Sequence, residues 1–113
     1  MSMPNYSRND FILIKFPFSD LSNSKIRPAI VINSSHASHD LIVAALTSKT
    51  HNLLKGEFIL KDWQAVGLNV ETAIKRGIFT LHENLVLRKI GSLEPDDQAD
   101  LDKALLGWLD LNR

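Results

Sequence analysis

Short apolar runs separated by polar joints make up most of the chain. Three early runs are rich in β-branched and aromatic residues, which favours strands: residues 11–18, 27–33 and 41–46. The first run is expected to end at Pro17, and Pro28 falls near the start of the second, where a missing N–H does least harm. The joints at residues 19–25 and 34–40 are polar and are predicted to be loops.

The pattern continues more weakly through the middle of the chain and changes near its end. Further short strands are predicted at residues 56–60, 72–75, 78–81 and 86–90, with a helical turn at 62–66. Short strands at this spacing are typical of a barrel or sandwich. A single amphipathic helix is predicted over residues 95–111.

The helix prediction rests on one apolar face and on the residues of its first turn. Leu101, Leu105, Trp108 and Leu109 are spaced i, i+4, i+7 and i+8. Pro95 suits the start of a helix, and the two aspartates that follow it suit the positive end of the helix dipole.

Composition adds an ordinary globular background with an uneven charge. The 113 residues are expected to form one domain, residues 1–113, and the absence of cysteine excludes disulfides and thiolate chemistry. Without an exported leader or an apolar span, a cytoplasmic protein is expected. Residues 1–93 hold 11 Lys/Arg against 7 Asp/Glu, whereas residues 94–113 hold 2 against 6. A phosphate-binding surface therefore fits the first part, although two solvated faces explain the same split.

Three polar residues stand at the ends of predicted strands. Arg27 opens the second strand, and Thr47 with Ser48 closes the third. If these strands are antiparallel neighbours, the guanidinium and the hydroxyls share one edge of the sheet. An arginine can donate two parallel hydrogen bonds to a phosphate, and hydroxyls can add neutral ones. Taken alone, an arginine at a strand start is more often solvated or ion-paired, and a Thr-Ser pair at a strand end is more often a turn.

The order of several motifs resembles one known family. The stretch IKFPFSDLSNSKIRPAIVI has an apolar strand, a polar loop and an Arg-Pro that leads a second apolar strand. LTS, GL, IFTL and IGSLEPDDQADLDKAL follow in order, at residues 46–48, 67–68, 78–81 and 90–105. Together they are similar to the MazF/PemK toxins of type II toxin–antitoxin systems, from about residue 10 to residue 109. The loop DLSNSK lacks the glycine, and the LTS motif the preceding proline, that many relatives carry, which leaves the RNA sequence recognised open.

The resemblance implies a mainly β fold, an SH3-like (MazF/CcdB-type) β-barrel with a C-terminal amphipathic α-helix. It implies a homodimeric endoribonuclease that cleaves single-stranded RNA with neither metal nor cofactor and is neutralised by a cognate antitoxin. Carried over to this chain, the catalytic residues are Arg27 and Thr47. The residues expected to contact RNA are Ser48, Lys25, Lys49 and His51, with Lys55 as a further flanking cation. His51 is also a candidate for proton transfer, because arginine is a poor general base.

Other interpretations remain open at the level of sequence. One is a poison on the same barrel that cleaves nothing, like the CcdB gyrase toxins; another is a silent RNA-binding barrel. The amphipathic helix is expected to continue into residues 109–113, which argues against the gyrase-poison interpretation. His36, His39 and Asp40 could hold a metal, but they are expected on a loop with one carboxylate. Trp63 could stack on bases, whereas Trp108 is expected in the core or a dimer contact.

Overall fold

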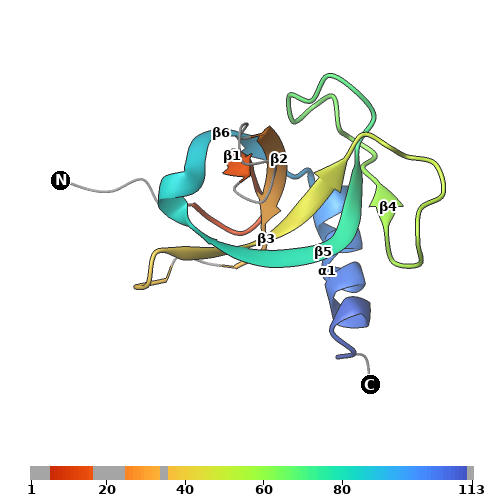
Figure 1. The fold of residues 1–113 in the computed structure, drawn as a ribbon. Coiled ribbons are helices and arrows are strands. Elements are labelled where there is room, and N and C mark those ends of the chain that lie inside the picture. The colour runs from red at the N-terminus through yellow and green to blue at the C-terminus, as the bar shows by residue number, and fades with distance from the viewer. Residues whose placement is uncertain (1–5, 17–24, 34–35, 112–113) are drawn as a thin grey trace.

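The computed structural model describes residues 6–16, 25–33 and 36–111. Within them, six strands, a short 3-10 helix and one α-helix follow one another along the chain (Figure 1). The strands are β1 (Asp10–Phe16), β2 (Lys25–Val31), β3 (Asp40–Thr47), β4 (Phe58–Ile59), β5 (Ala73–His82) and β6 (Val86–Ser92). The 3-10 helix is Glu83–Leu85, and α1 is Pro95–Trp108. The predicted loop at 19–25 lies mostly outside the described residues, as do positions 34 and 35 of the second loop.

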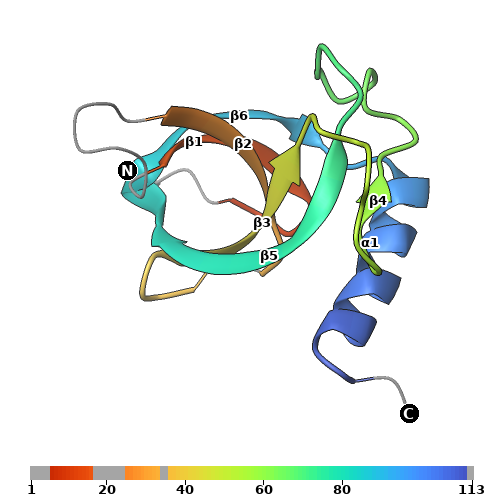
Figure 2. The ribbon, with the colours of Figure 1, turned by 45° about the vertical axis from the view of Figure 1, so that its right-hand side comes forward.

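The strands form one antiparallel sheet in the order β4-β5-β3-β2-β1-β6. The sheet is strongly coiled, and the long strand β5 curves along the side opposite β6 (Figure 2). In the described part of the chain its two edge strands, β4 and β6, do not pair, so the sheet is not closed. The mainly β architecture with one C-terminal helix is confirmed, whereas the open sheet does not confirm the SH3-like barrel.

Several predicted boundaries differ from the structure, most of all in the middle of the chain. The strands predicted at 72–75 and 78–81 are one strand, β5, because the backbone of Lys75, Arg76 and Gly77 continues past Ala45 as a bulge instead of turning. The strand predicted at 56–60 shortens to the two residues of β4. The predicted helical turn at 62–66 is a series of hydrogen-bonded turns over residues 61–67.

Two apolar clusters use the two faces of the sheet. One packs against α1 and contains Phe11, Ile30, Ala44, Leu46, Leu60, Val66, Ile74, Leu93, Leu101, Leu105 and Trp108. The other lies on the opposite face and contains Ile12, Ile14, Ala29, Val31, Leu41, Val43 and Leu81. Successive side chains of a strand point to opposite faces, so the near-continuous apolar runs of β1, β2 and β3 supply both clusters.

The helix α1 is held at its start by a buried carboxylate. Asp97 is only 1% exposed, and its two oxygens accept the backbone N–H groups of Lys61, at 2.9 Å, and of Asp62, at 3.1 Å. Trp108 is in the core as expected, and the partly buried Trp63 packs against the same cluster.

The helix ends earlier than predicted. It stops at Trp108, Leu109 is its C-cap and is 54% exposed, and Asp110 has a left-handed φ of 57°. The amphipathic pattern therefore overran the helix, since the last apolar positions face solvent instead of the core. The argument against a gyrase poison relied on a helix that continues through residues 109–113, and the structure removes it. Residues 112 and 113 lie outside the described residues.

Candidate nucleic-acid interface

Arg27 and Thr47 lie on neighbouring antiparallel strands, at the same end of the sheet. Strands β2 and β3 pair through Val31–Val43, Ile30–Ala44 and Ala29–Ala45, which is the last pair. Arg27 and Thr47 lie two residues beyond that pair, at equivalent positions of the same register. The ladder ends there because Pro28 has no N–H to donate toward β3.

Strand alternation assigns the two side chains to one face of the sheet. Arg27 lies two residues before Ala29 and four before Val31, so its side chain is on the same face of β2 as theirs, and its partner on β1 is the buried Ile14. Thr47 lies four residues after Val43 and shares its face of β3, and Val43 belongs to the same apolar cluster as Ile14. Both positions therefore fall on the face opposite α1, at the open end of the β2–β3 pair.

The residues around Thr47 form a short polar segment. Thr47 is partly buried, and its Oγ1 accepts the backbone N–H of Lys49 at 3.0 Å. Ser48, Lys49 and His51 are exposed, as a surface that contacts RNA requires. Arg27 is also exposed. Lys25 begins β2, but its side chain lies outside what the structure describes.

Two glutamates accept hydrogen bonds from residues of the β3–β4 connection, and the sequence pattern gave no sign of either. The Thr50 hydroxyl donates to Glu71 Oε1 at 3.0 Å. Glu57 accepts the backbone N–H of Leu54 at 2.8 Å through Oε1 and that of Arg76 at 3.1 Å through Oε2. The hydrogen bond from Leu54 has the largest effect and lowers the pKa of Glu57. Desolvation has the second-largest effect and opposes it, while the hydrogen bond from Arg76 and the nearby charge of Lys75 lower the pKa further. The contacts of Glu71 with Thr50 and of Glu57 with Arg76 join segments about 20 residues apart, so they could only be found once the strands were placed.

The histidines of the β2–β3 connection lie at the other end of the sheet from Thr47. His36 Nδ1 is 2.9 Å from the Ser38 hydroxyl, and His39 Nδ1 is 3.1 Å from Glu83 Oε1. Within the described ranges, no three histidine or acidic side chains come together in a way that could hold a metal ion. The metal interpretation of His36, His39 and Asp40 therefore gains no support from the geometry.

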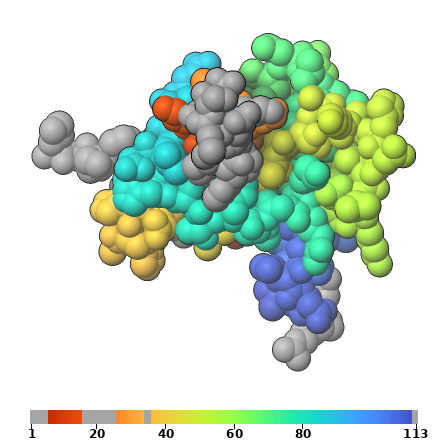
Figure 3. Space-filling view, viewed as in Figure 1, coloured from red at the N-terminus to blue at the C-terminus, as the bar shows by residue number. Residues whose placement is uncertain are grey.

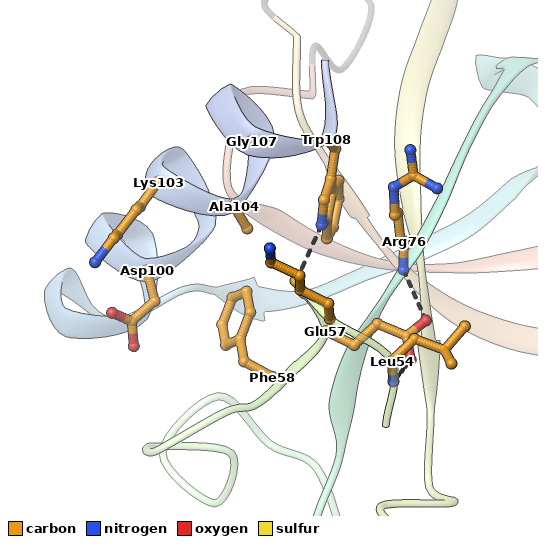
Figure 4. Close-up of a pocket in the computed structure, with 11 residues that line it drawn as sticks. Leu54, Glu57, Phe58, Arg76, Asp100, Lys103, Ala104, Gly107 and Trp108 are labelled. Atoms are coloured by element: carbon orange, nitrogen blue, oxygen red, sulfur yellow. Dashed lines mark hydrogen bonds between the residues drawn. The ribbon is translucent and has the colours of Figure 1, made fainter. Parts of the chain in front are cut away.

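A groove lies between α1 and the connection from β3 to β4; we call it the helix groove (Figure 4). Its volume is about 910 Å³. Its lining residues are Leu54, Lys55, Gly56, Glu57, Phe58, Arg76, Asp100, Lys103, Ala104, Gly107 and Trp108. The Trp108 indole N–H donates to the carbonyl of Gly56 at 3.0 Å, which fixes the connection to the helix. Gly56 has a φ of +89°, and a Cβ there would lie 2.5 Å from the indole nitrogen, so only glycine fits.

A second groove, of about 640 Å³, lies between the sheet and the last turns of α1; we call it the apolar groove. Most of its lining is aliphatic: Ile32, Ile42, Ile78, Leu105, Leu106, Leu109 and Leu111, with Arg8, Thr80 and Asp102 at its polar positions. The last turns of α1 project beyond the sheet (Figure 3). Exposed leucines thus continue the groove along the projecting part of the helix.

The fold is that of MazF-type toxins, as solved structures from two groups of bacteria show. An endoribonuclease in complex with its cognate antitoxin, from a mycobacterial species, superposes with a TM-score of 0.76 over 96% of this chain and 98% of its own, at 14% identity. The toxin MazF-mt6 of Mycobacterium tuberculosis gives 0.69 over 92% and 99%, at 20% identity. A MazE–MazF structure from Deinococcus radiodurans gives 0.75 over 93% and 96%, at 14% identity.

The sequence itself assigns the family. Residues 7–109 match the model of the PemK-like, MazF-like toxins of type II toxin–antitoxin systems, and this chain belongs to that family. No curated protein sequence matches the chain. In the part of the chain that the structure describes, no helix is long and apolar enough to cross a membrane.

Proposed function

We propose that this chain is a toxin endoribonuclease that cleaves single-stranded RNA in the cytoplasm without a metal ion or cofactor. The observation that carries the proposal is the position of Arg27 and Thr47, at one end of neighbouring strands and on one face, in a chain of the PemK/MazF family. The exposed Ser48, Lys49 and His51 follow directly, and Lys25 lies two residues before Arg27 on β2; we assign all four to RNA binding.

The chemistry needs no covalent attack by the protein. The 2′-hydroxyl of the substrate attacks the adjacent phosphorus, the bond to the 5′-oxygen breaks, and the products are a 2′,3′-cyclic phosphate and a 5′-hydroxyl. Arg27 would stabilise the negative charge that grows on the phosphoryl oxygens, and Thr47 would donate a hydrogen bond to a non-bridging oxygen. The remaining rate acceleration would come from holding the 2′-oxygen in line with the leaving oxygen.

Proton transfer is assigned to a separate group because a guanidinium with a pKa above about 12 rarely gives up its proton. His51 is the histidine nearest in sequence to Thr47, four residues on, and it is exposed. We assign it the role of accepting the 2′-hydroxyl proton or of donating to the leaving 5′-oxygen. The other loop histidines lie at the far end of the sheet.

The test is cleavage of a defined single-stranded RNA in EDTA by the wild type and by Arg27→Ala and Thr47→Ala. We expect the wild type to cut and both variants to lose the activity, with a cyclic phosphate on the upstream product by mass spectrometry. If the folded wild type leaves RNA intact, the nuclease proposal is wrong, and a binding poison of the gyrase-toxin kind or a silent RNA-binding protein replaces it. Cleavage that EDTA abolishes would refute the metal-free mechanism.

We further propose that the protein acts as a homodimer and that a cognate antitoxin neutralises it. The apolar groove supports the dimer, because Leu106 in the last turn of α1 and Leu109 and Leu111 just beyond it are 44%, 54% and 55% exposed. Exposed leucines next to an aliphatic groove are typical of an interface. An antitoxin is bound in the mycobacterial relative described above. The SH3-like description of the coiled sheet remains a prediction.

A further inference from the structure

Glu71 carries a negative charge beside the segment to which we assign RNA binding. It lies two residues before the start of β5, and its Oε1 accepts the Thr50 hydroxyl at 3.0 Å. Thr50 stands directly between Lys49 and His51 in the sequence. The carboxylate therefore contacts the same polar segment that follows Thr47.

The register of β3 and β5 places this carboxylate on the face of the sheet that carries Thr47. Thr47 and Ala73 are the last pair of the two strands, and the end of β3 lies beside the start of β5 (Figure 2). The chain is still paired one residue before β5, because the Thr72 carbonyl accepts the N–H of Leu60 at 2.9 Å. Paired residues share a face, as do side chains two residues apart on an extended chain, so Glu71 follows Ala73 to the face of Thr47.

Glu71 has a hydroxyl partner but no cation within the described ranges. The ion pairs there use the carboxylates of other residues, Asp10, Glu83, Asp100 and Asp102. Glu71 is exposed, and an ionised carboxylate has about four positions at which it can accept a hydrogen bond. The Thr50 hydroxyl occupies one of them, which leaves the outer part of the carboxylate available to a ligand.

A carboxylate in a surface that binds RNA needs donors from the RNA. It repels the phosphates, which carry the same sign of charge, and it weakens binding where it meets no donor. The donors that RNA offers are its 2′-hydroxyls and the N–H groups of its base edges. Glu71 contacts the chain three residues beyond Thr47, so it lies beside the reacting phosphate and faces the base of a neighbouring nucleotide.

We propose that Glu71 selects a base next to the cut and that Thr50 positions its carboxylate. The inference rests on the proposed function, because it names which RNA that site accepts. Guanine fits best, since its N1–H and N2–H can donate two parallel hydrogen bonds to one carboxylate. Adenine and cytosine each offer one amino group beside a ring acceptor. Uracil places a carbonyl oxygen on either side of its single ring N–H, and these oxygens repel the carboxylate.

The test measures binding with probes that cannot be cleaved. Four fluorescein-labelled 2′-O-methyl hexanucleotides carry guanine, adenine, cytosine or uracil at one central position in a uracil background, and fluorescence anisotropy gives their affinities for the full-length protein. The methyl groups remove the 2′-hydroxyl donors, so any remaining preference belongs to the base. We expect the guanine probe to bind at least about fivefold more tightly than the uracil probe, a difference of roughly 1 kcal/mol. Equal affinities of the four probes overturn the proposal.

Matched variants assign the preference to this carboxylate. Glu71→Gln removes the charge and leaves an amide that both donates and accepts, so the four affinities should fall within about twofold of one another. Glu83→Gln makes the same charge change at the other end of β5, where Glu83 contacts His39, and should keep the preference. Thr50→Val should reduce the preference and Thr50→Ser should retain it, with circular dichroism confirming that each variant folds. A merely structural contact would change all four affinities alike and leave their ratios as in the wild type, which would refute the proposal.

Cleavage separates this inference from the nuclease proposal. Sequencing of the ends cut from an RNA with randomised positions should show the same preference for the wild type and its loss in Glu71→Gln. A wild type that cleaves at sites unchanged by Glu71→Gln refutes base selection alone. A wild type that binds the guanine probe selectively through Glu71 but leaves RNA intact refutes the nuclease alone. If Glu71→Gln abolishes cleavage and keeps the ratios of the affinities, the carboxylate serves the 2′-hydroxyl, and base selection is wrong.

Discussion

At the scale of single residues, the candidate site depends on what an arginine can do that a lysine cannot. Both carry a positive charge, but the planar guanidinium donates two parallel hydrogen bonds to one phosphate, whereas an ammonium acts as a point charge. Arg27 is exposed at the end of the β2–β3 ladder, where Pro28 leaves no N–H for pairing. The position therefore leaves the side chain available for a ligand.

Arg27→Lys tests that distinction directly. We expect the single-turnover rate on a fluorophore–quencher RNA to fall roughly 100-fold, because the charge remains while the paired donors are lost. Thr47→Ser is the matched substitution at the other position, and it should keep most of the rate because it keeps the hydroxyl. A rate for Arg27→Lys equal to that of the wild type would show that no bidentate contact forms in the transition state.

Residue chemistry could be predicted from the sequence, but residue neighbours could not. The Arg-Pro that opens β2 and the hydroxyls that close β3 are visible as interruptions of apolar runs. Glu57 and Glu71 look like ordinary surface acids in the same sequence. Their roles follow from the donors that folding brings near them, the backbone N–H of Arg76 for Glu57 and the Thr50 hydroxyl for Glu71. No periodic pattern encodes such a contact.

At the scale of elements, local pattern predicted β1, β2, β3 and the start of α1, and it failed where tertiary packing overrides propensity. The sequence Lys75-Arg76-Gly77 predicts a turn. In the structure these three residues instead form a bulge within β5, opposite the single residue Ala45 of β3. Leu109 continues the apolar spacing of α1, but the helix has ended. The strand continues because it pairs with β3, whereas the helix ends locally, with Asp110 at a left-handed φ and the Leu111 N–H donating to the carbonyl of Leu106.

The buried Asp97 joins α1 to the turn at residues 61–67. Asp97→Ala removes a charged acceptor from two backbone N–H groups and leaves them without it in a buried place. We expect the free energy of unfolding to fall by about 2–4 kcal/mol, measured by urea denaturation with an unchanged m-value. Asp97→Asn keeps one acceptor and should lose less. A loss below about 0.5 kcal/mol, the usual range for surface substitutions, would contradict this role.

Glu57 predicts how stability changes on the acid side. Its pKa is lowered below the ordinary value of 4.5, chiefly by the hydrogen bond from Leu54. A carboxyl with a lowered folded-state pKa adds stability above its unfolded-state pKa, and this is lost as the pH falls through the folded-state value. The urea midpoint of the wild type should therefore exceed that of Glu57→Gln at pH 7, and the gap should close toward pH 3. A gap that does not change with pH would rule out the charge as its cause.

At the scale of the whole molecule, the coiled sheet separates three surfaces. Arg27 and Thr47 belong to the face opposite α1, the helix groove lies between α1 and the β3–β4 connection, and the apolar groove lies by the projecting end of α1. The sequence predicted the first surface through a hairpin register. The two grooves could not be predicted, because each forms where the segment at residues 100–111 meets strands or loops at least about 20 residues earlier in the chain.

The separation of these surfaces allows dimer formation to be tested apart from RNA binding. Leu109 is 54% exposed in the apolar groove, so Leu109→Asp places a charge on the proposed interface without disturbing the core of the monomer. We expect light scattering at micromolar concentration to show a dimer for the wild type and a monomer for Leu109→Asp. Leu54→Asp is the matched control, since it changes an exposed leucine of the helix groove, and it should stay dimeric. A monomeric wild type would exclude the dimer, and a dimeric Leu109→Asp would place the contact elsewhere on the molecule.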